Sequence, residues 1–130
     1  MYKIETTEYG LKLIFQGFIS KEELKRCHLE IAKIVPMLKK GFSVLHDMRG
    51  MQTLRPDARE LQKRSMVNAK KAGHGRAAQI VNNTIAAIQF KRLAKEAGVS
   101  DTSRQIDASS VSDCEKVAID WLVKGIDPDK

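Results

Sequence analysis

Alternating apolar and polar residues at the start of the chain predict a β-hairpin. Residues 2–7 and 11–17 both alternate, and Gly10 lies between the two runs. Strict alternation is typical of a strand with one buried face, and a glycine between two such runs favours a tight turn. The side chains expected to face the core are Tyr2, Ile4, Leu11, Leu13 and Phe15.

The next extended stretch, residues 41–50, predicts a strand that is buried on both faces. Phe42, Val44 and Leu45 make it apolar on either side, whereas Asp47 and Arg49 place charges near its C-terminal end. Strands of this kind are typical of the middle of a parallel sheet that is covered by helices. In open α/β sheets, the C-terminal ends of such strands usually face the bound partner.

Apolar residues spaced three and four apart predict helices within residues 20–35, 56–72, 85–97 and 110–125. Ser20 is a suitable N-cap for the first helix, and Pro36 should end or kink it because proline has no amide hydrogen. Ser110 to Asp113 has the spacing of a capping box at the start of the last helix.

Residues 76–82 and 103–107 predict two further strands, so strands alternate with single helices after the hairpin. This order implies right-handed crossovers and a largely parallel sheet, with the hairpin as its one antiparallel pair. We therefore predict one α/β domain over residues 1–125, with a mixed sheet of about five strands and about four helices. Residues 126–130 are expected to form a frayed tail.

Composition agrees with an ordinary globular domain. The chain has 130 residues, of which 42% are hydrophobic and 30% charged, a size and balance typical of one domain with one core. Its N-terminus has no long apolar run, so we expect neither a secretory signal nor a transmembrane span. A cytoplasmic location is the default expectation.

The net charge of +7 raises the question of nucleic-acid binding. The basic residues are spread along much of the chain, and the few aromatic residues are not placed as a stacking platform. We therefore expect no specific nucleic-acid role. Cys27 and Cys114 fall on apolar helix stripes and are expected to be buried free thiols, with a disulfide or redox pair as the alternative.

No recognisable catalytic constellation is present. His46 and Asp47 are adjacent on a strand, so their side chains point to opposite faces and cannot form a dyad. The chain has no nucleophile elbow, no His-Glu-x-x-His and no glycine-rich phosphate loop. We expect no enzyme activity, no cofactor and no metal, and we interpret His28 as a partly buried helix residue.

A candidate anion-binding cleft is predicted at the C-terminal strand ends. There Arg49 would meet the N-terminus of helix 85–97, whose free amides favour an anion. On the alternative interpretation, Asn83 only caps its helix and Asp47 only satisfies loop amides. The candidate ligand-binding residues are Asp47, Arg49, Thr53, Asn82, Asn83 and Thr84.

Apolar residues on the outer side of two helices predict a contact patch. Helix 56–72 has a narrow inward face of mostly small residues, which leaves Met66 on its flank and Val67 nearly opposite. Together with two residues near the start of helix 85–97, they could form a homodimer interface. The members of this predicted patch are Met66, Val67, Ile85 and Ile88.

The leading hypothesis from these patterns is a non-catalytic binding or regulatory domain with a protein partner. The alternative is a carrier of a small or lipid ligand, with an apolar pocket between sheet and helices.

Two segments also resemble a known family. Gly-Phe-Ser-Val-Leu-His-Asp-Met at 41–48 and Gln-Phe-Lys-Arg-Leu-Ala-Lys-Glu-Ala-Gly at 89–98, with the order of elements, resemble the small bacterial SpoIIAA-like family. The resemblance covers nearly the whole chain and implies a fold related to STAS and CRAL-TRIO domains. By fold analogy alone, the CRAL-TRIO relatives suggest a lipid ligand.

The same resemblance bears on regulation. Anti-sigma-factor antagonists with a STAS domain carry a phosphorylatable serine in an Asp-Ser-Ser-Gly segment after the central strand. When Asp47 is matched to the strand-end aspartate, Gln52, Thr53 and Leu54 occupy the place of that motif. The resemblance therefore implies a binding surface without the phosphoserine, with Thr53 as the nearest hydroxyl.

Overall fold

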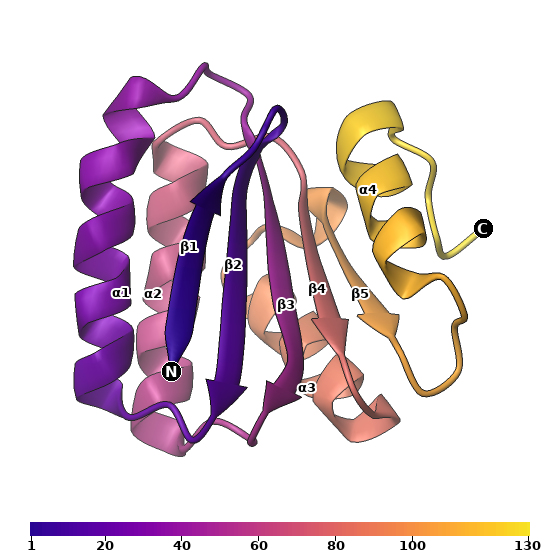
Figure 1. Ribbon diagram of the computed structural model, residues 1–130, viewed down its shortest axis with the longest axis horizontal. Coiled ribbons are helices and arrows are strands. Elements are labelled where there is room, and N and C mark those ends of the chain that lie inside the picture. The colour runs from indigo at the N-terminus through magenta and orange to yellow at the C-terminus, as the bar shows by residue number, and fades with distance from the viewer.

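A five-stranded sheet in the order β1-β2-β3-β4-β5 organises the computed structural model, which describes residues 1–130 (Figure 1). β1 and β2 are antiparallel, and each later strand is parallel to its neighbour. The predicted α/β class and mixed sheet are confirmed. The strands are β1 (Tyr2–Thr6), β2 (Gly10–Gly17), β3 (Ser43–Met51), β4 (Ala77–Val81) and β5 (Ser103–Asp107).

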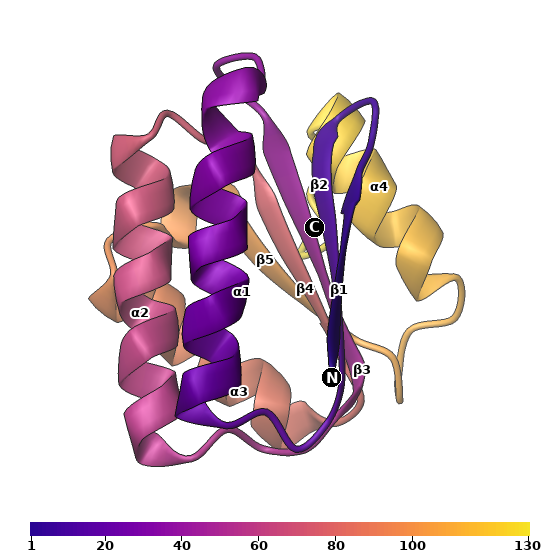
Figure 2. The same cartoon turned by 60° about the vertical axis from the view of Figure 1, so that its left-hand side comes forward.

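Three helices cover one face of the sheet and a fourth covers the other (Figure 2). Each of the first three connects a strand to its next parallel neighbour in the same direction across the sheet. Right-handed crossovers therefore place all three on one face. The helices are α1 (Lys21–Ile34), α2 (Pro56–Lys71), α3 (Thr84–Glu96) and, on the opposite face, α4 (Cys114–Lys124).

The ends of the helices follow local chemistry. Ser20 Oγ accepts the Glu23 amide hydrogen at 3.1 Å, so the predicted cap is confirmed. α1 ends at Ile34 and continues directly into a 3₁₀ turn over Val35–Met37, so the regular helix stops near Pro36 as predicted. The predicted capping box is wrong, because Asp113 has a φ of 53° and makes no side-chain cap. Asp107 instead holds the preceding turn by accepting hydrogen bonds from Ser109.

β3 lies between β2 and β4 and is buried on both faces, as predicted. Phe42, just before it, and Val44 join the core layer under α1, α2 and α3, whereas Leu45 joins the layer under α4. The two free cysteines belong to different layers, Cys27 to the first and Cys114 to the second. Since the sheet separates them, the alternative of a disulfide between them does not fit this fold.

The predicted apolar patch on α2 and α3 is wrong for two of its four members. Met66 is only 7% exposed, and Val67 packs against the larger core layer. The reason is that α2 is the middle helix and contacts both α1 and α3, so its flanks are covered. Ile85 and Ile88 are exposed as expected, at 71% and 54%.

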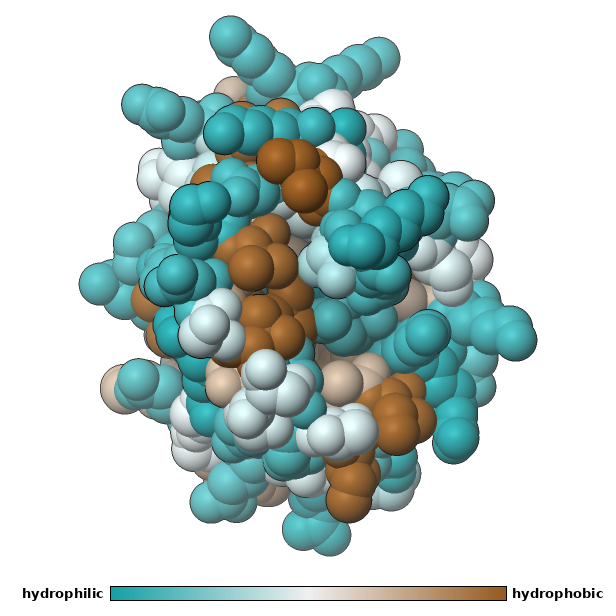
Figure 3. Space-filling view, turned by 90° about the vertical axis from the view of Figure 1, so that its right-hand side faces the viewer, coloured by the Kyte–Doolittle hydropathy of each residue, from teal (hydrophilic) through white to brown (hydrophobic).

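The face that includes the β5 edge carries its apolar side chains in separate groups among hydrophilic ones (Figure 3).

Arg104 of β5 fixes the C-terminal tail, which is therefore not frayed at Asp127. Arg104 Nε and Nη2 donate to the Asp127 carboxylate at 2.9 and 3.1 Å. The same guanidinium lies 4.4 Å from the centre of the Trp121 ring, so the tail is tied to α4 as well. No helix in the chain has the length and apolar character needed to span a membrane.

Candidate functional site

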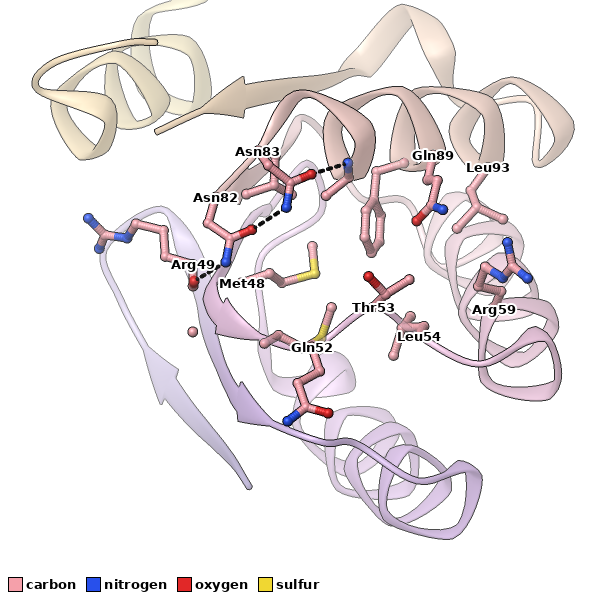
Figure 4. A pocket seen from close by; sticks show the side chains of 15 residues that line it. Met48, Arg49, Gln52, Thr53, Leu54, Arg59, Asn82, Asn83, Gln89 and Leu93 are labelled. Carbon is pink, nitrogen blue, oxygen red and sulfur yellow. Dashed lines mark hydrogen bonds between the residues drawn. The ribbon is translucent and has the colours of Figure 1, made fainter. Parts of the chain in front are cut away.

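The predicted cleft at the C-terminal ends of the strands is present (Figure 4). It has a volume of about 480 Å³ and lies between the end of β3, the loop that follows it and the start of α3. The cleft is lined, as predicted, by Arg49, Thr53, Asn82 and Asn83, and Gln89 and Arg59 add polar groups that the sequence reasoning did not name. Arg59 makes no ion pair, so it is an available cation in the lining.

Asp47 and Arg49 do not place their charges in this cleft, which corrects the prediction. Figure 4 shows the Arg49 side chain directed away from the pocket. Its Nε and Nη2 donate to the Asp47 carboxylate at 2.9 and 2.7 Å, and Nη2 lies 3.8 Å from Glu115. Strand alternation explains this arrangement, because Asp47 and Arg49 share the face of Leu45 toward α4. The Arg49 guanidinium lowers the pKa of Asp47 by donating these hydrogen bonds.

The hydrogen bonds of the remaining candidates are largely used within the fold. Asn83 Oδ1 accepts the Ala86 amide hydrogen at 2.8 Å and so caps α3. Asn82 Nδ2 donates to the Arg49 carbonyl at 2.8 Å. Thr84 Oγ1 donates to Asp107 at 2.8 Å and does not line the cleft. The alternative interpretation of Asn83, that it caps its helix, is therefore confirmed.

A second space lies between α1, α2 and the sheet, and we call it the histidine cavity. It has a volume of about 400 Å³, and 13 of its 23 lining residues are hydrophobic. Small-molecule sites typically enclose about 300–1,000 Å³ and are mostly apolar with a few placed polar groups. All three histidines of the chain line this cavity, namely His28, His46 and His74.

The cavity exists because small side chains leave space above the sheet. On α2, Ser65, Ala69 and Ala72 face it, and Ala77 of β4 lies below. Leu11, Leu13 and Val44 of β2 and β3 make the rest of the floor apolar. The narrow inward face of α2 was visible in the sequence, and it was the one signal for a cavity at this place.

A row of polar side chains crosses the sheet beside this floor. His46, Gln79 and Gln105 are direct neighbours on the paired strands β3, β4 and β5. Gln79 Oε1 accepts hydrogen bonds from Gln105 Nε2 at 2.9 Å and from Ser103 Oγ at 3.1 Å. Its Nε2 lies 3.3 Å from His46 Nδ1. Because Gln79 Oε1 already accepts two hydrogen bonds, Gln79 Nε2 is the atom that donates to His46 Nδ1.

Burial keeps the three histidines neutral. It lowers the pKa of His46 to about 3, and repulsion from His28 and His74 acts in the same direction. Burial also lowers the pKa of His28, whose Nε2 lies 3.3 Å from Gln62 Oε1, and that of His74. His74 Nδ1 is buried without any hydrogen-bond partner. The cavity therefore offers neutral hydrogen-bonding groups within an apolar wall.

No group of three or more metal-binding side chains comes together anywhere in the chain. The sequence reasoning did not name His46, His74, Gln62 or Gln79 as site residues. Polar residues at inward positions of β3 and β4 were the available signal for His46 and Gln79. Whether they would be buried together depended on the pairing of the strands, which the sequence alone does not fix.

A scan against protein-family models finds none that matches this chain, and a search of curated proteins finds no match either. Any function therefore has to be inferred from the geometry of the chain itself.

Proposed function

We propose that the protein is a non-catalytic binding domain that holds a small, mainly apolar molecule in the histidine cavity. The observation that carries this proposal is a cavity of about 400 Å³ with a hydrophobic majority in its lining.

The apolar part of the lining supports the same proposal. An occupant that contacts Ile31 would add dispersion contacts to a side chain that the fold buries only in part. A ligand would therefore stabilise the fold in addition to being held by it.

We also propose that the chain is a member of the SpoIIAA-like family. The five-stranded mixed sheet with four helices supports this, together with the two segments at 41–48 and 89–98. Thr53 stands in place of the family's serine motif and is exposed at the cleft.

The cleft at the strand ends supports a second candidate function, the docking of an anionic ligand or an acidic group of a partner protein. Arg59 favours it, since this arginine lines the cleft and makes no ion pair. Ile85 and Ile88, exposed on the adjoining helix, would add apolar contacts with such a partner or with a second copy of the chain.

Native mass spectrometry of protein purified from its own cells, without denaturation, tests the leading proposal. We expect a fraction of the molecules to carry a small organic adduct that is released when the protein unfolds. The physical reason is that a tightly bound ligand leaves slowly compared with the time of purification. A mass equal to that of the bare chain under every growth condition would count against the proposal.

A further inference from the structure

We infer that the occupant of the histidine cavity is an uncharged, mainly apolar carbonyl compound, which accepts hydrogen bonds from the Nε2 groups of His46 and Gln62. This ligand class rests on the proposed function and narrows it. Two buried side chains in the lining have an unpartnered N–H group, and the buried acceptors beside them are all in use.

Four polar side chains in the cavity lining are at least nine-tenths buried. They are His46, Gln62, Gln79 and Ser103, which are 9%, 5%, 1% and 4% exposed. The remaining polar residues of the lining are more exposed than these four. Because buried polar groups need partners, the hydrogen bonds of the four decide which ligand groups the cavity can hold away from water.

The acceptors on the sheet are in use. Gln79 Oε1 accepts hydrogen bonds from Gln105 and Ser103, and Ser103 Oγ accepts a further one from Gln105 at 3.4 Å. Gln79 Nε2 in turn donates to His46 Nδ1, which lies 3.3 Å away. A ring nitrogen that accepts a hydrogen bond carries no proton, so the proton of the neutral His46 ring is on Nε2. This N–H group makes no hydrogen bond within the protein.

Gln62 of α2 presents the second donor. Its Oε1 lies 3.3 Å from His28 Nε2. An amide oxygen only accepts, so His28 donates this hydrogen bond and the amide nitrogen of Gln62 is left without a partner. In the whole chain, His74 Nδ1 is the one side-chain polar atom that lacks both a partner and accessible surface. The unpartnered nitrogens of His46 and Gln62 therefore keep accessible surface, and both residues line the cavity.

A carbonyl oxygen matches this pattern of two donors without a free acceptor. It accepts through two lone pairs and has no hydrogen of its own that needs a partner. An alcohol would bring an O–H group for which the four buried side chains have no free acceptor, and a buried unpaired donor is costly. A hydrocarbon would leave both N–H groups unpaired. Ketones, esters and quinones share the group that the cavity requires.

The charges around the cavity argue against an anionic occupant. Arg64 is the one charged side chain among the lining residues, and it is exposed. A carboxylate held by His46 and Gln62 would lose its hydration and meet only neutral groups, which is strongly unfavourable. An uncharged carbonyl group loses much less on transfer from water.

The volume agrees with a molecule of two fused rings or of similar size. An engineered apolar cavity of about 150 Å³ holds one benzene molecule. A space of about 400 Å³ thus accepts a probe with a naphthalene ring system. Four probes of nearly the same size carry a ketone, an alkene, an alcohol or a carboxylate, namely 2-acetylnaphthalene, 2-isopropenylnaphthalene, 1-(2-naphthyl)ethanol and 2-naphthoate. The first two differ only in the replacement of the carbonyl oxygen by a methylene group.

Equilibrium dialysis of the four probes against wild type, Gln62→Met and His46→Phe tests the inferred class. We expect the ketone to bind wild type at least as tightly as the more hydrophobic alkene. The ratio of these two affinities should fall by about tenfold in at least one variant, the usual effect of one hydrogen bond. Gln89→Met is the matched control, because Gln89 lines the strand-end cleft and not the cavity, and the ratio should be unchanged in it.

Nitrogen-15 spectra of the wild-type side chains provide a readout that does not depend on the folding of a variant. This matters for His46→Phe, which leaves Gln79 without its acceptor. We expect the Nε2–H tautomer at His46, and we expect 2-acetylnaphthalene to shift at least one of His46 Nε2 and Gln62 Nε2. An Nδ1–H tautomer at His46, or no shift of either nitrogen, would overturn the inferred class.

Three dialysis results would also overturn it. A ratio unchanged in both variants would mean that the carbonyl meets neither donor. Tightest binding of the alcohol would reveal an accessible acceptor, and tightest binding of 2-naphthoate would mean an anionic ligand near Arg64. Each of these results would leave the proposed cavity-binding function standing. If none of the probes binds, the carbonyl class is rejected, and the proposed function is judged separately by the adduct in the native protein.

Discussion

Lowering the pH from about 7 to about 4.5 is expected to reduce the free energy of unfolding by about 2.5 kcal/mol through His46 alone. Burial lowers the pKa of this side chain from 6.5 to about 3. Because the folded pKa lies below the unfolded one, the unfolded chain binds more protons as the pH falls. The loss should begin near pH 6.5 and grow at about 1.4 kcal/mol per pH unit toward pH 3.

The matched control is His46→Gln, which does not titrate and whose side-chain oxygen can still accept from Gln79. Urea unfolding at several pH values should show the decline in wild type and a weaker one in the variant. His28 and His74 add to the decline in both proteins, since burial lowers the pKa of each. Asp47 and Asp127 have lowered pKa values, so their contributions are lost mainly below about pH 4. Identical pH dependence of the two proteins between pH 7 and 4.5 would show that His46 is not buried and neutral.

Filling the histidine cavity with Ala69→Leu is expected to weaken binding of 2-acetylnaphthalene at least tenfold without loss of stability. Ala69 is one of the small α2 residues that line the space, and a leucine there would occupy part of the volume that the ligand needs. Added carbon atoms usually strain a filled core by about 1–3 kcal/mol, but here they enter an existing cavity.

Ala87→Leu is a suitable control for this experiment. Ala87 is also half-buried against the core on a helix, but it does not line the cavity. It should leave the affinity for 2-acetylnaphthalene unchanged. Thermal unfolding and titration of both variants would measure the two effects. Wild-type affinity in Ala69→Leu would mean that the probe binds elsewhere.

The fold was predictable because its local signals agree. Alternation located β1 and β2, the two-sided apolar run at Phe42 to Leu45 located the central strand, and Ser20 and Pro36 marked the ends of α1. These signals depend on neighbours within a few residues. The start of α4 was missed because Asp107, outside the apparent capping box, holds the turn before it.

The sites were less predictable because they depend on what lies beside each element. Met66 is buried by the neighbours of α2, and no periodicity within α2 shows that it is the middle helix. Alternation places Asp47 and Arg49 on the face opposite His46, but it does not show that the two side chains pair with each other there. The polar row of His46, Gln79 and Gln105 required the register of three strands, which are far apart in the sequence.

Backbone amide spectra recorded with a library of small uncharged molecules test the central claim most directly. If the histidine cavity is a ligand site, the perturbed amides should cluster around it, at Val44, Ala69 and Ala77, and the cluster should disappear in Ala69→Leu. Perturbations confined to Asn83 to Ile85 would assign ligand binding to the strand-end cleft instead. No perturbation around the cavity by any molecule in the library would contradict the account.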